Sequence, residues 1–281
     1  MGYELEHSGL GVQIGDIKIP GVFFADDICI TVPVNQMRRM MDIISTYALQ
    51  DKIEFSPEKS GILAIGYKTP TEPYHMMSIP DGDKWDEIDL KFINTAKYLG
   101  VMFSSKYGMY TEHWNNCLSR IQASRALLGC MAKEVVNPLA IGDMLWNTYG
   151  LPSFAYAWEI IGLTKTQQEK ITKEHRNYKH LVLNLPHYTK NCVLDDISIG
   201  IDPLEYKDKL KIGYWWYIQR LPETSWVYKT VFYQAKLWER GALHNGFWLH
   251  SLIETLDRHG IPHIALWSKS ENKLYWNSRK L

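Results

Sequence analysis

The sequence lacks paired cysteines, long apolar runs and an excess charge of either sign. Its four cysteines form no Cys-x-x-Cys pair, which argues against a zinc knuckle and against a dense disulfide framework. No uncharged apolar run is long enough to cross a bilayer, and the acidic N-terminus has no apolar segment of the signal-peptide kind. These absences predict an intracellular protein, cytoplasmic or nuclear, that has no membrane partner.

The charges balance over the whole chain, with 31 basic and 31 acidic residues. The total therefore does not indicate a strongly basic nucleic-acid binder. Residues 1–109 hold 10 basic and 15 acidic residues, whereas residues 110–281 hold 21 and 16. This asymmetry indicates either two parts with different roles or two ordinary solvated surfaces. The sequence also contains no P-loop, no Gly-x-Gly-x-x-Gly and no Gly-x-Ser-x-Gly motif.

What the sequence does have is enough apolar material for a core. Hydrophobic residues make up 46% of its 281 residues and aromatic residues 13%, which is typical of a folded chain of about two domains. Short β-rich runs separated by turn residues come first, and helical periodicity follows. We therefore predict an α+β fold, with strands and one packed helix over residues 1–107 and only helices over residues 108–281.

The first part predicts two hairpins and a helix. Gly15-Asp16 and Asp26-Asp27 each join two β-rich runs, as turn residues do in hairpins. Apolar residues at helical spacing predict a helix over about 34–50. Further along, we expect strands over 60–67 and 97–103, separated by a proline-rich loop over 68–89.

Three helix starts stand out in the second part. Thr111 precedes a periodic apolar run, Thr164 with Gln167 forms a capping-box pattern, and Asp202 precedes a proline at the first helical position. Leu210, Trp215 and Ile218 fall on one face of the last of these helices, so the tryptophan is expected in the core.

The sharpest chemical feature is the Phe24-Ala25-Asp26-Asp27 run. Two carboxylates at a tight hairpin tip repel each other unless a divalent cation neutralises them, and Mg²⁺ favours carboxylate oxygens together with water and substrate phosphates. Such a pair can take part in two-metal nucleotidyl transfer. The alternative for this run alone is an ordinary Asp-rich β-turn.

Further short motifs follow the acidic pair in a fixed order. After the predicted helix comes Phe55–Ser60, which ends in Lys59-Ser60 before a strand, and then Tyr98-Leu99-Gly100. This series resembles the polymerase palm of reverse transcriptases, most closely those of non-LTR (LINE-type) retrotransposons. The helical remainder resembles the thumb and tail after such a palm, through Leu194–Gly200, Asp202-Pro203 and Tyr214–Pro222.

The resemblance implies a role for each matched residue. Asp26 and Asp27 would be catalytic carboxylates that bind Mg²⁺, and Lys59 would lie near the phosphates of the incoming deoxynucleotide. Tyr98, Leu99 and Gly100 would form the primer grip. The implied partners are an RNA template, a DNA primer and deoxynucleotides. Alternatively, Lys59 is a solvated lysine, and Leu99 belongs to a core strand.

One departure from the family bears on activity. Another essential Asp and the fingers precede the hairpin in reverse transcriptases, whereas only 25 residues precede Asp26 here. We therefore expect a partial palm (1–107) with a thumb and tail (108–281), inactive alone, that binds metal weakly. Incomplete strand pairing also predicts self-association. The alternatives are a non-catalytic RNA- or protein-binding remnant and a relic without a retained task.

The remaining polar residues give weaker hypotheses. Two of the predicted helices carry basic residues that are candidates for phosphate contacts, with an ordinary solvated helix as the alternative. They are Lys165, Lys170, Lys173, Arg176 and Lys179 on one helix and Lys207, Lys209 and Lys211 on another. His259 and His263 have a metal-ligand spacing, but Gly260 and Pro262 lie between them and favour a loop.

Overall fold

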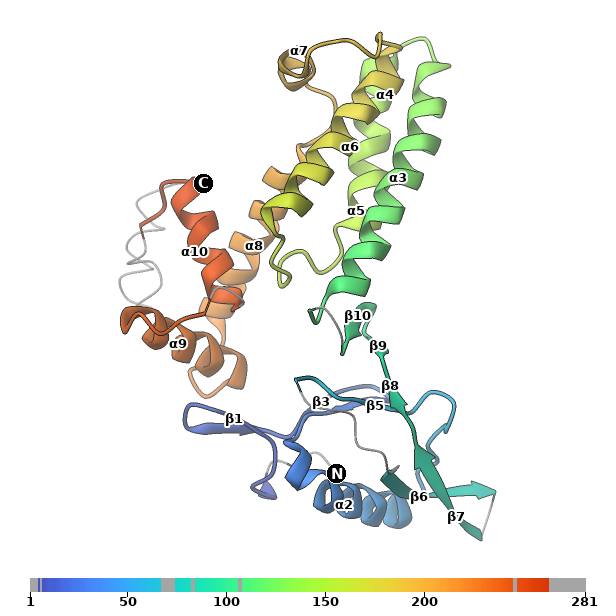
Figure 1. Ribbon diagram of the computed structural model, residues 1–281, viewed down its shortest axis with the longest axis vertical. Coiled ribbons are helices and arrows are strands. Elements are labelled where there is room, and N and C mark those ends of the chain that lie inside the picture. Colours follow the sequence, from blue (N-terminus) through green and yellow to red (C-terminus); the bar gives the residue numbers. More distant parts are fainter. Residues whose placement is uncertain are drawn as a thin grey trace. The chain divides into compact units, whose positions relative to one another are not determined.

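The computed structural model describes residues 5, 7–66, 74–81, 84–105, 108–244 and 247–262. Over these residues the chain is α+β and divides into two compact units, Met1–His113 and Trp114–Leu281 (Figure 1). The first unit contains short strands and a packed helix, and the second contains helices. In the described part of the chain, no helix is both long enough and apolar enough to cross a membrane.

The two hairpins predicted near the N-terminus are confirmed, although the turn of the second is Ala25-Asp26, one residue earlier than the expected Asp26-Asp27. Gly15-Asp16 joins the first pair of strands, with Ile14 opposite Ile17, and the second pair places Phe24 opposite Asp27. Both pairs are antiparallel, as two-residue turns require. The strands are β1 (Val12–Ile14), β2 (Ile17–Ile19), β3 (Gly21–Phe24) and β4 (Asp27–Ile30).

The predicted helix is confirmed as η1 (Val34–Gln36) followed by α2 (Met37–Asp51). Its buried side chains include Met40, Met41 and Ile44, which belong to the predicted apolar face. They form the core of this unit with Leu10, Leu90 and other apolar residues, and α2 packs against β6 (Tyr74–Asp81). Burial of these apolar side chains positions α2 on the strands.

Two expectations between residues 60 and 90 were wrong. The strand expected over 60–67 is only β5 (Ile62–Leu63), which pairs in parallel with β8 (Phe92–Ile93), and residue 67 lies outside the described residues. The loop expected over 68–89 contains a hairpin of β6 and β7 (Lys84–Leu90). Pro80 is accommodated because the ladder is interrupted between Ser78 and Asp81, so no regular backbone donor is needed there.

The single strand expected over 97–103 is instead a hairpin. Its strands are β9 (Thr95–Tyr98) and β10 (Val101–Ser104). Leu99 and Gly100 form the turn, with φ of 45° and 83°. Positive φ at both central residues is the type I′ pattern that matches strand twist. Over the described residues the strands form five two-stranded sheets rather than one sheet.

The second unit consists of helices whose starts were largely predicted. Thr164 and Gln167 make both bonds of a capping box, and the Asp202 side chain accepts hydrogen bonds from the backbone of Leu204 and Glu205. The helices are α3 (Thr111–Lys133), α4 (Pro138–Leu145), η2 (Trp146–Gly150), α5 (Leu151–Phe154), α6 (Lys165–Leu183), α7 (Asn191–Asp196), α8 (Pro203–Arg220), α9 (Trp226–Glu239) and α10 (Trp248–Arg258).

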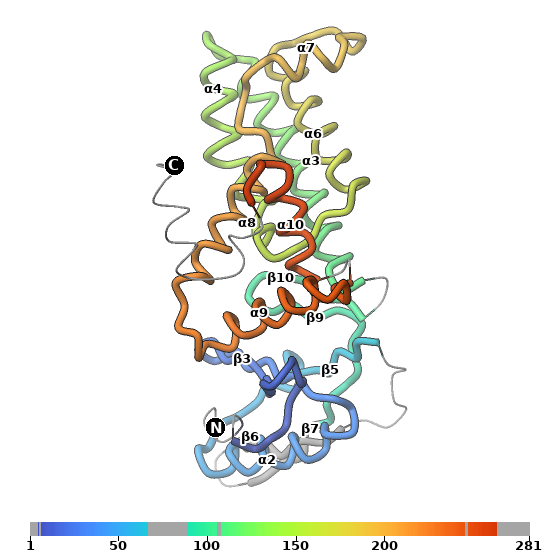
Figure 2. Tube along the Cα trace, turned by 90° about the vertical axis from the view of Figure 1, so that its left-hand side faces the viewer, coloured from blue at the N-terminus to red at the C-terminus, as the bar shows by residue number. Residues whose placement is uncertain are grey.

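A buried tryptophan, Trp146, lies in the larger core of this unit. Its ring stacks on Tyr178 at 4.5 Å between centroids and on His175 at 5.0 Å, and Phe154 packs at 5.5 Å. Helices α3, α4 and α6 lie side by side (Figure 2), and each contributes residues to the core that contains Trp146. The smaller core joins α8, α9 and α10 and includes Trp215, as the sequence predicted. η2 is a π-turn within the continuous helical stretch from α4 to α5.

We predict opposite effects for two glycine-to-alanine substitutions in this unit. At Gly200 the φ is +70°, and an added Cβ would lie 2.2 Å from Cδ1 of Trp146. Gly200→Ala should therefore lower the free energy of unfolding by about 2–4 kcal/mol. Gly213 lies inside α8 with open space around its Cα, so Gly213→Ala should raise it by about 0.5–1 kcal/mol. Urea denaturation followed by tryptophan fluorescence measures both, and equal effects would contradict the packing described.

Candidate functional site

The hairpin of β3 and β4 presents the two predicted catalytic carboxylates. Ala25 and Asp26 form its two-residue turn, and Asp27 begins β4. Ala25 has a φ of 53°, in the left-handed region that a side chain rarely occupies. Glycine is the usual residue at such a turn position. The backbone is therefore strained next to the acidic pair, and strain of this kind concentrates at functional sites.

Both carboxylates are exposed, and they have no basic partner in the described residues. Phe24, just before the turn, is 62% exposed. Two exposed like charges on adjacent residues destabilise each other unless a cation or a positively charged partner shields them. The pair is therefore open to a cation from solvent, and it does not take part in the packing of the unit.

Tyr98, at the end of β9, is brought to the same strands. Its hydroxyl donates a hydrogen bond to the backbone carbonyl of Val22 at 3.3 Å. Burial raises the pKa of Tyr98, and the nearby thiol of Cys29 and carboxylate of Asp27 raise it further. Asp27 and Cys29 lie two residues apart on β4 and share one face of the hairpin. Two of the predicted motifs, distant in sequence, thus meet at this face.

The other predicted residues lie apart from this contact. Leu99 and Gly100 form the turn beyond Tyr98, and Leu99 is 39% exposed. Lys59 is exposed in a turn whose backbone donates to the carbonyl of Ser56 at 3.2 Å. No contact between Lys59 and the acidic pair is found in the described residues. Of the matched residues, Tyr98 is joined to the acidic hairpin by a hydrogen bond.

The donor set at the hairpin fits Mg²⁺ in part. Asp26 and Asp27 supply the carboxylate oxygens that hard cations favour, and Mg²⁺ usually takes only one or two carboxylates in addition to water and substrate phosphates. In the described part of the chain, no group of three or more His, Cys, Asp or Glu residues could hold a metal ion. The two aspartates would therefore form a shallow site that needs ligands from a substrate.

A second polar region, which sequence reasoning missed, is a groove of about 1100 Å³ in the helical unit. It lies between α6, α8 and the 195–202 segment. Its charged lining includes Arg176, Lys179, Asp195, Asp202, Glu205 and Lys209. Several of these charged side chains already form hydrogen bonds with other groups of the protein. The Arg176 guanidinium makes two 2.7 Å hydrogen bonds to Asp195, and Lys179 donates to the carbonyl of Leu194 at 2.8 Å.

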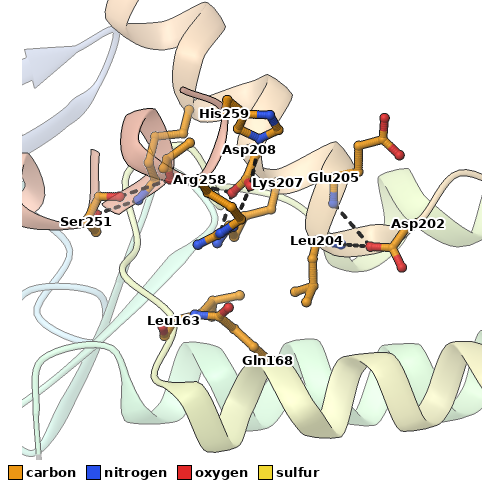
Figure 3. A network of polar contacts seen from close by, with 12 residues as sticks. Leu163, Gln168, Asp202, Leu204, Glu205, Lys207, Asp208, Ser251, Arg258 and His259 are labelled. Carbon is orange, nitrogen blue, oxygen red and sulfur yellow. Dashed lines mark hydrogen bonds and ion pairs between the residues drawn. The ribbon is translucent and has the colours of Figure 1, made fainter. Parts of the chain in front are cut away.

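Buried charges also occupy the contact between α8 and α10 (Figure 3). Asp208 pairs with Lys207 at 3.1 Å, with His259 at 3.0 Å and with Arg258. Burial alone would raise the pKa of Asp208, but the charges of Lys207 and Arg258 and the hydrogen bonds from Lys207 and His259 outweigh it and hold the pKa below the usual range. The network therefore joins the two helices through ion pairs.

The phosphate contacts expected for Lys207 and Lys211 were wrong, because both side chains are buried. The ammonium of Lys211 donates to Oγ of Ser251 at 2.6 Å, and burial, reinforced by the neighbouring Lys207, lowers its pKa to about 8. His259 belongs to the Asp208 network, whereas His263 lies outside the described residues. The sequence signal that could have revealed this was the placement of Lys207, Lys211 and Trp215 at i, i+4 and i+8 on one face.

Comparison of the chain with protein-family models, with curated proteins and with solved structures finds no match.

We predict a pH-dependent loss of stability at His175. Its Nε2 donates to the carbonyl of Ile199 at 2.9 Å, and burial lowers its pKa to about 4. An unfolded histidine titrates near 6.5, so between these values the unfolded chain binds more protons. Stability should fall by about 3 kcal/mol as the pH drops from 6.5 to 4.

His175→Gln, which retains a donor for Ile199, should remove this component from urea denaturation curves recorded across the pH range. His187→Gln is the matched control, because His187 is exposed. An unchanged pH dependence in His175→Gln would contradict the assignment.

Proposed function

We propose that this chain is part of the polymerase region of a reverse transcriptase of the non-LTR retrotransposon type. In this proposal the first unit is a partial palm and the second is the thumb and tail. The activity of the polymerase region is Mg²⁺-dependent, template-directed addition of deoxynucleotides to a DNA primer on RNA. The observation that carries the proposal is the Asp26-Asp27 pair, exposed and without an ion-pair partner among the described residues, on a strained hairpin to which Tyr98 is hydrogen-bonded.

Nucleotidyl transfer needs carboxylates that are fixed in position yet free of internal partners. A two-residue hairpin meets both needs, because its strands fix the backbone while the turn projects into solvent. When bound, Mg²⁺ supplies activation of the primer 3′ hydroxyl and charge neutralisation at the leaving pyrophosphate. Asp26 and Asp27 would hold it, and the exposed Lys59 would contact the phosphates of the deoxynucleotide.

The β9–β10 hairpin supports a primer-binding role next to the acidic pair. Tyr98 ties this hairpin to β3 through the Val22 carbonyl, so its turn residues Leu99 and Gly100 keep a fixed relation to β3 and β4. Gly100, with no side chain, leaves its backbone N–H and C=O accessible to a nucleic-acid strand. This placement and the resemblance of the motifs support the proposed role of the turn as a primer grip.

A non-catalytic remnant that binds RNA or a protein is the second candidate. It is favoured by the absence of a third acidic ligand beside Asp26 and Asp27 in the described residues. A two-metal site with only two protein carboxylates would hold its ions weakly. The two candidates differ in what they require of the acidic pair, because a remnant needs no metal there.

The first test is metal binding at the hairpin. Mn²⁺ replaces Mg²⁺ at oxygen sites and broadens nearby NMR signals, so titration of the full chain should broaden the backbone signals of residues 24–28 first. Asp26→Asn/Asp27→Asn should abolish this selectivity, because the amides are poorer ligands for hard cations. Asp16→Asn, at the turn of the neighbouring hairpin, is the matched control. Equal broadening in the double variant would contradict a metal site.

The second test asks whether binding of a DNA primer annealed to an RNA template depends on Mg²⁺ and on Asp26. A labelled DNA primer annealed to RNA should bind the full chain more tightly in Mg²⁺ than in EDTA, and Asp26→Asn should remove this gain while Asp16→Asn retains it. Fluorescence anisotropy measures the binding, and the same samples supplied with deoxynucleotides report extension. Extension that survives Asp26→Ala would overturn the catalytic assignment. Binding that is independent of Mg²⁺ and of Asp26 would favour the non-catalytic remnant.

A further inference from the structure

Helix α9 carries aromatic and basic residues along one exposed face. Trp226, Lys229, Tyr233 and Lys236 in the helix, and Arg240 just after it, follow one another at spacings of three and four residues. They therefore lie along a single stripe, in which Lys229 is half-buried and the others are exposed. Trp226 is 46% exposed and Tyr233 is 37% exposed. The stripe runs the whole length of the helix, about 21 Å.

The opposite face of α9 is occupied by the core of the helical unit. Tyr228, Val231 and Ala235 are buried against α8 and α10. This packing fixes the helix and leaves the stripe facing outward. Trp226 and Tyr233 are not among the described residues that form this core; helix α9 is labelled in Figure 1.

The three cations of the stripe have no acidic partner in the described residues. Lys236 instead lies over the ring of Phe232, 6.0 Å from its centroid. Within α9 the only acidic residue is Glu239, which lies about 100° around the helix from Arg240. The stripe is thus a positive surface interrupted by aromatic rings, in contrast to the paired lysines at the contact of α8 with α10.

We propose that this face of α9 binds single-stranded nucleic acid. Cations along a groove or ridge attract phosphates, and exposed aromatic rings stack on unpaired bases. A duplex would offer the phosphates but would leave Trp226 and Tyr233 without bases to stack on. A membrane surface fits less well, because the apolar face of α9 is already buried and cannot enter lipid. The proposal does not depend on the acidic hairpin or on polymerase activity.

The test is the salt dependence of binding to a short labelled single-stranded RNA, measured by fluorescence anisotropy on the full chain. Three phosphate contacts contribute a slope of about −2 to the plot of log K against log salt. Lys229→Gln/Lys236→Gln/Arg240→Gln should remove about this much of the slope. Trp226→Ala and Tyr233→Ala should each weaken binding about tenfold and leave the slope unchanged.

Lys165→Gln/Lys170→Gln/Lys173→Gln on α6 is the matched control. It removes the same charge from exposed positions of another helix, so it should keep most of the slope and affinity. DNA of the same sequence shows whether the sugar matters, and Asp26→Asn should not change RNA binding.

Three outcomes would overturn the proposal. The first is an equal loss of slope in the two triple variants, and the second is unaltered affinity in both aromatic variants. The third is binding to anionic phospholipid vesicles without binding to the oligonucleotide.

Discussion

The stacking of Trp146 on Tyr178 is the contact on which the helical unit depends. The two rings join the helical stretch from α4 to α5 with α6, and the Trp146 Nε1 donates to the carbonyl of Ile201 at 3.3 Å. One side chain therefore fixes two helical segments and the connection that precedes α8. Because Tyr178 also donates to the carbonyl of Gly142 at 2.7 Å, the polar ends of the buried rings are satisfied within the same core.

The same contact determines where the polar groove lies. Gly200 passes over the Trp146 ring with no room for a Cβ, and its backbone N–H donates to Asp143 at 2.9 Å. The 195–202 segment is thereby held against α6, with Asp195 opposite Arg176. The groove is a consequence of this close approach, since a bulkier residue at position 200 would push the segment outward.

Much of the fold could be predicted from local patterns, whereas contacts distant in sequence could not. The capping box at Thr164 and the proline after Asp202 act within one helical turn, so their residues suffice to identify them. The hairpin over 74–90 was missed because Pro80 and the acidic residues outweighed the strand signal, and its interrupted ladder is visible only in the structure. Leu99-Gly100 was read as strand because a type I′ turn with Leu at its first position is unusual.

The candidate site was predictable in part. The hairpin that carries Asp26 and Asp27 follows from two apolar runs around an acidic turn, but the approach of Tyr98 to Val22 joins residues 76 positions apart and has no local signal. The lysines show the same limit. Lys207 and Lys229 look alike in sequence, yet Lys207 is buried in an ion-pair network, whereas Lys229 is half-buried and has no ion-pair partner in the described residues. Only the packing of α8 against α10 separates them.

The π-turn at Trp146–Gly150 determines how Phe154 is rotated about the helix axis relative to Trp146. In a regular α-helix, residues eight apart lie about 80° from each other around the axis, whereas one extra residue in the turn brings Trp146 and Phe154 onto the same side. Their rings indeed meet at 5.5 Å. Deleting a single residue here would therefore rotate one aromatic ring out of the core without altering its composition, so this segment should tolerate exchange of exposed side chains far better than any change in residue count.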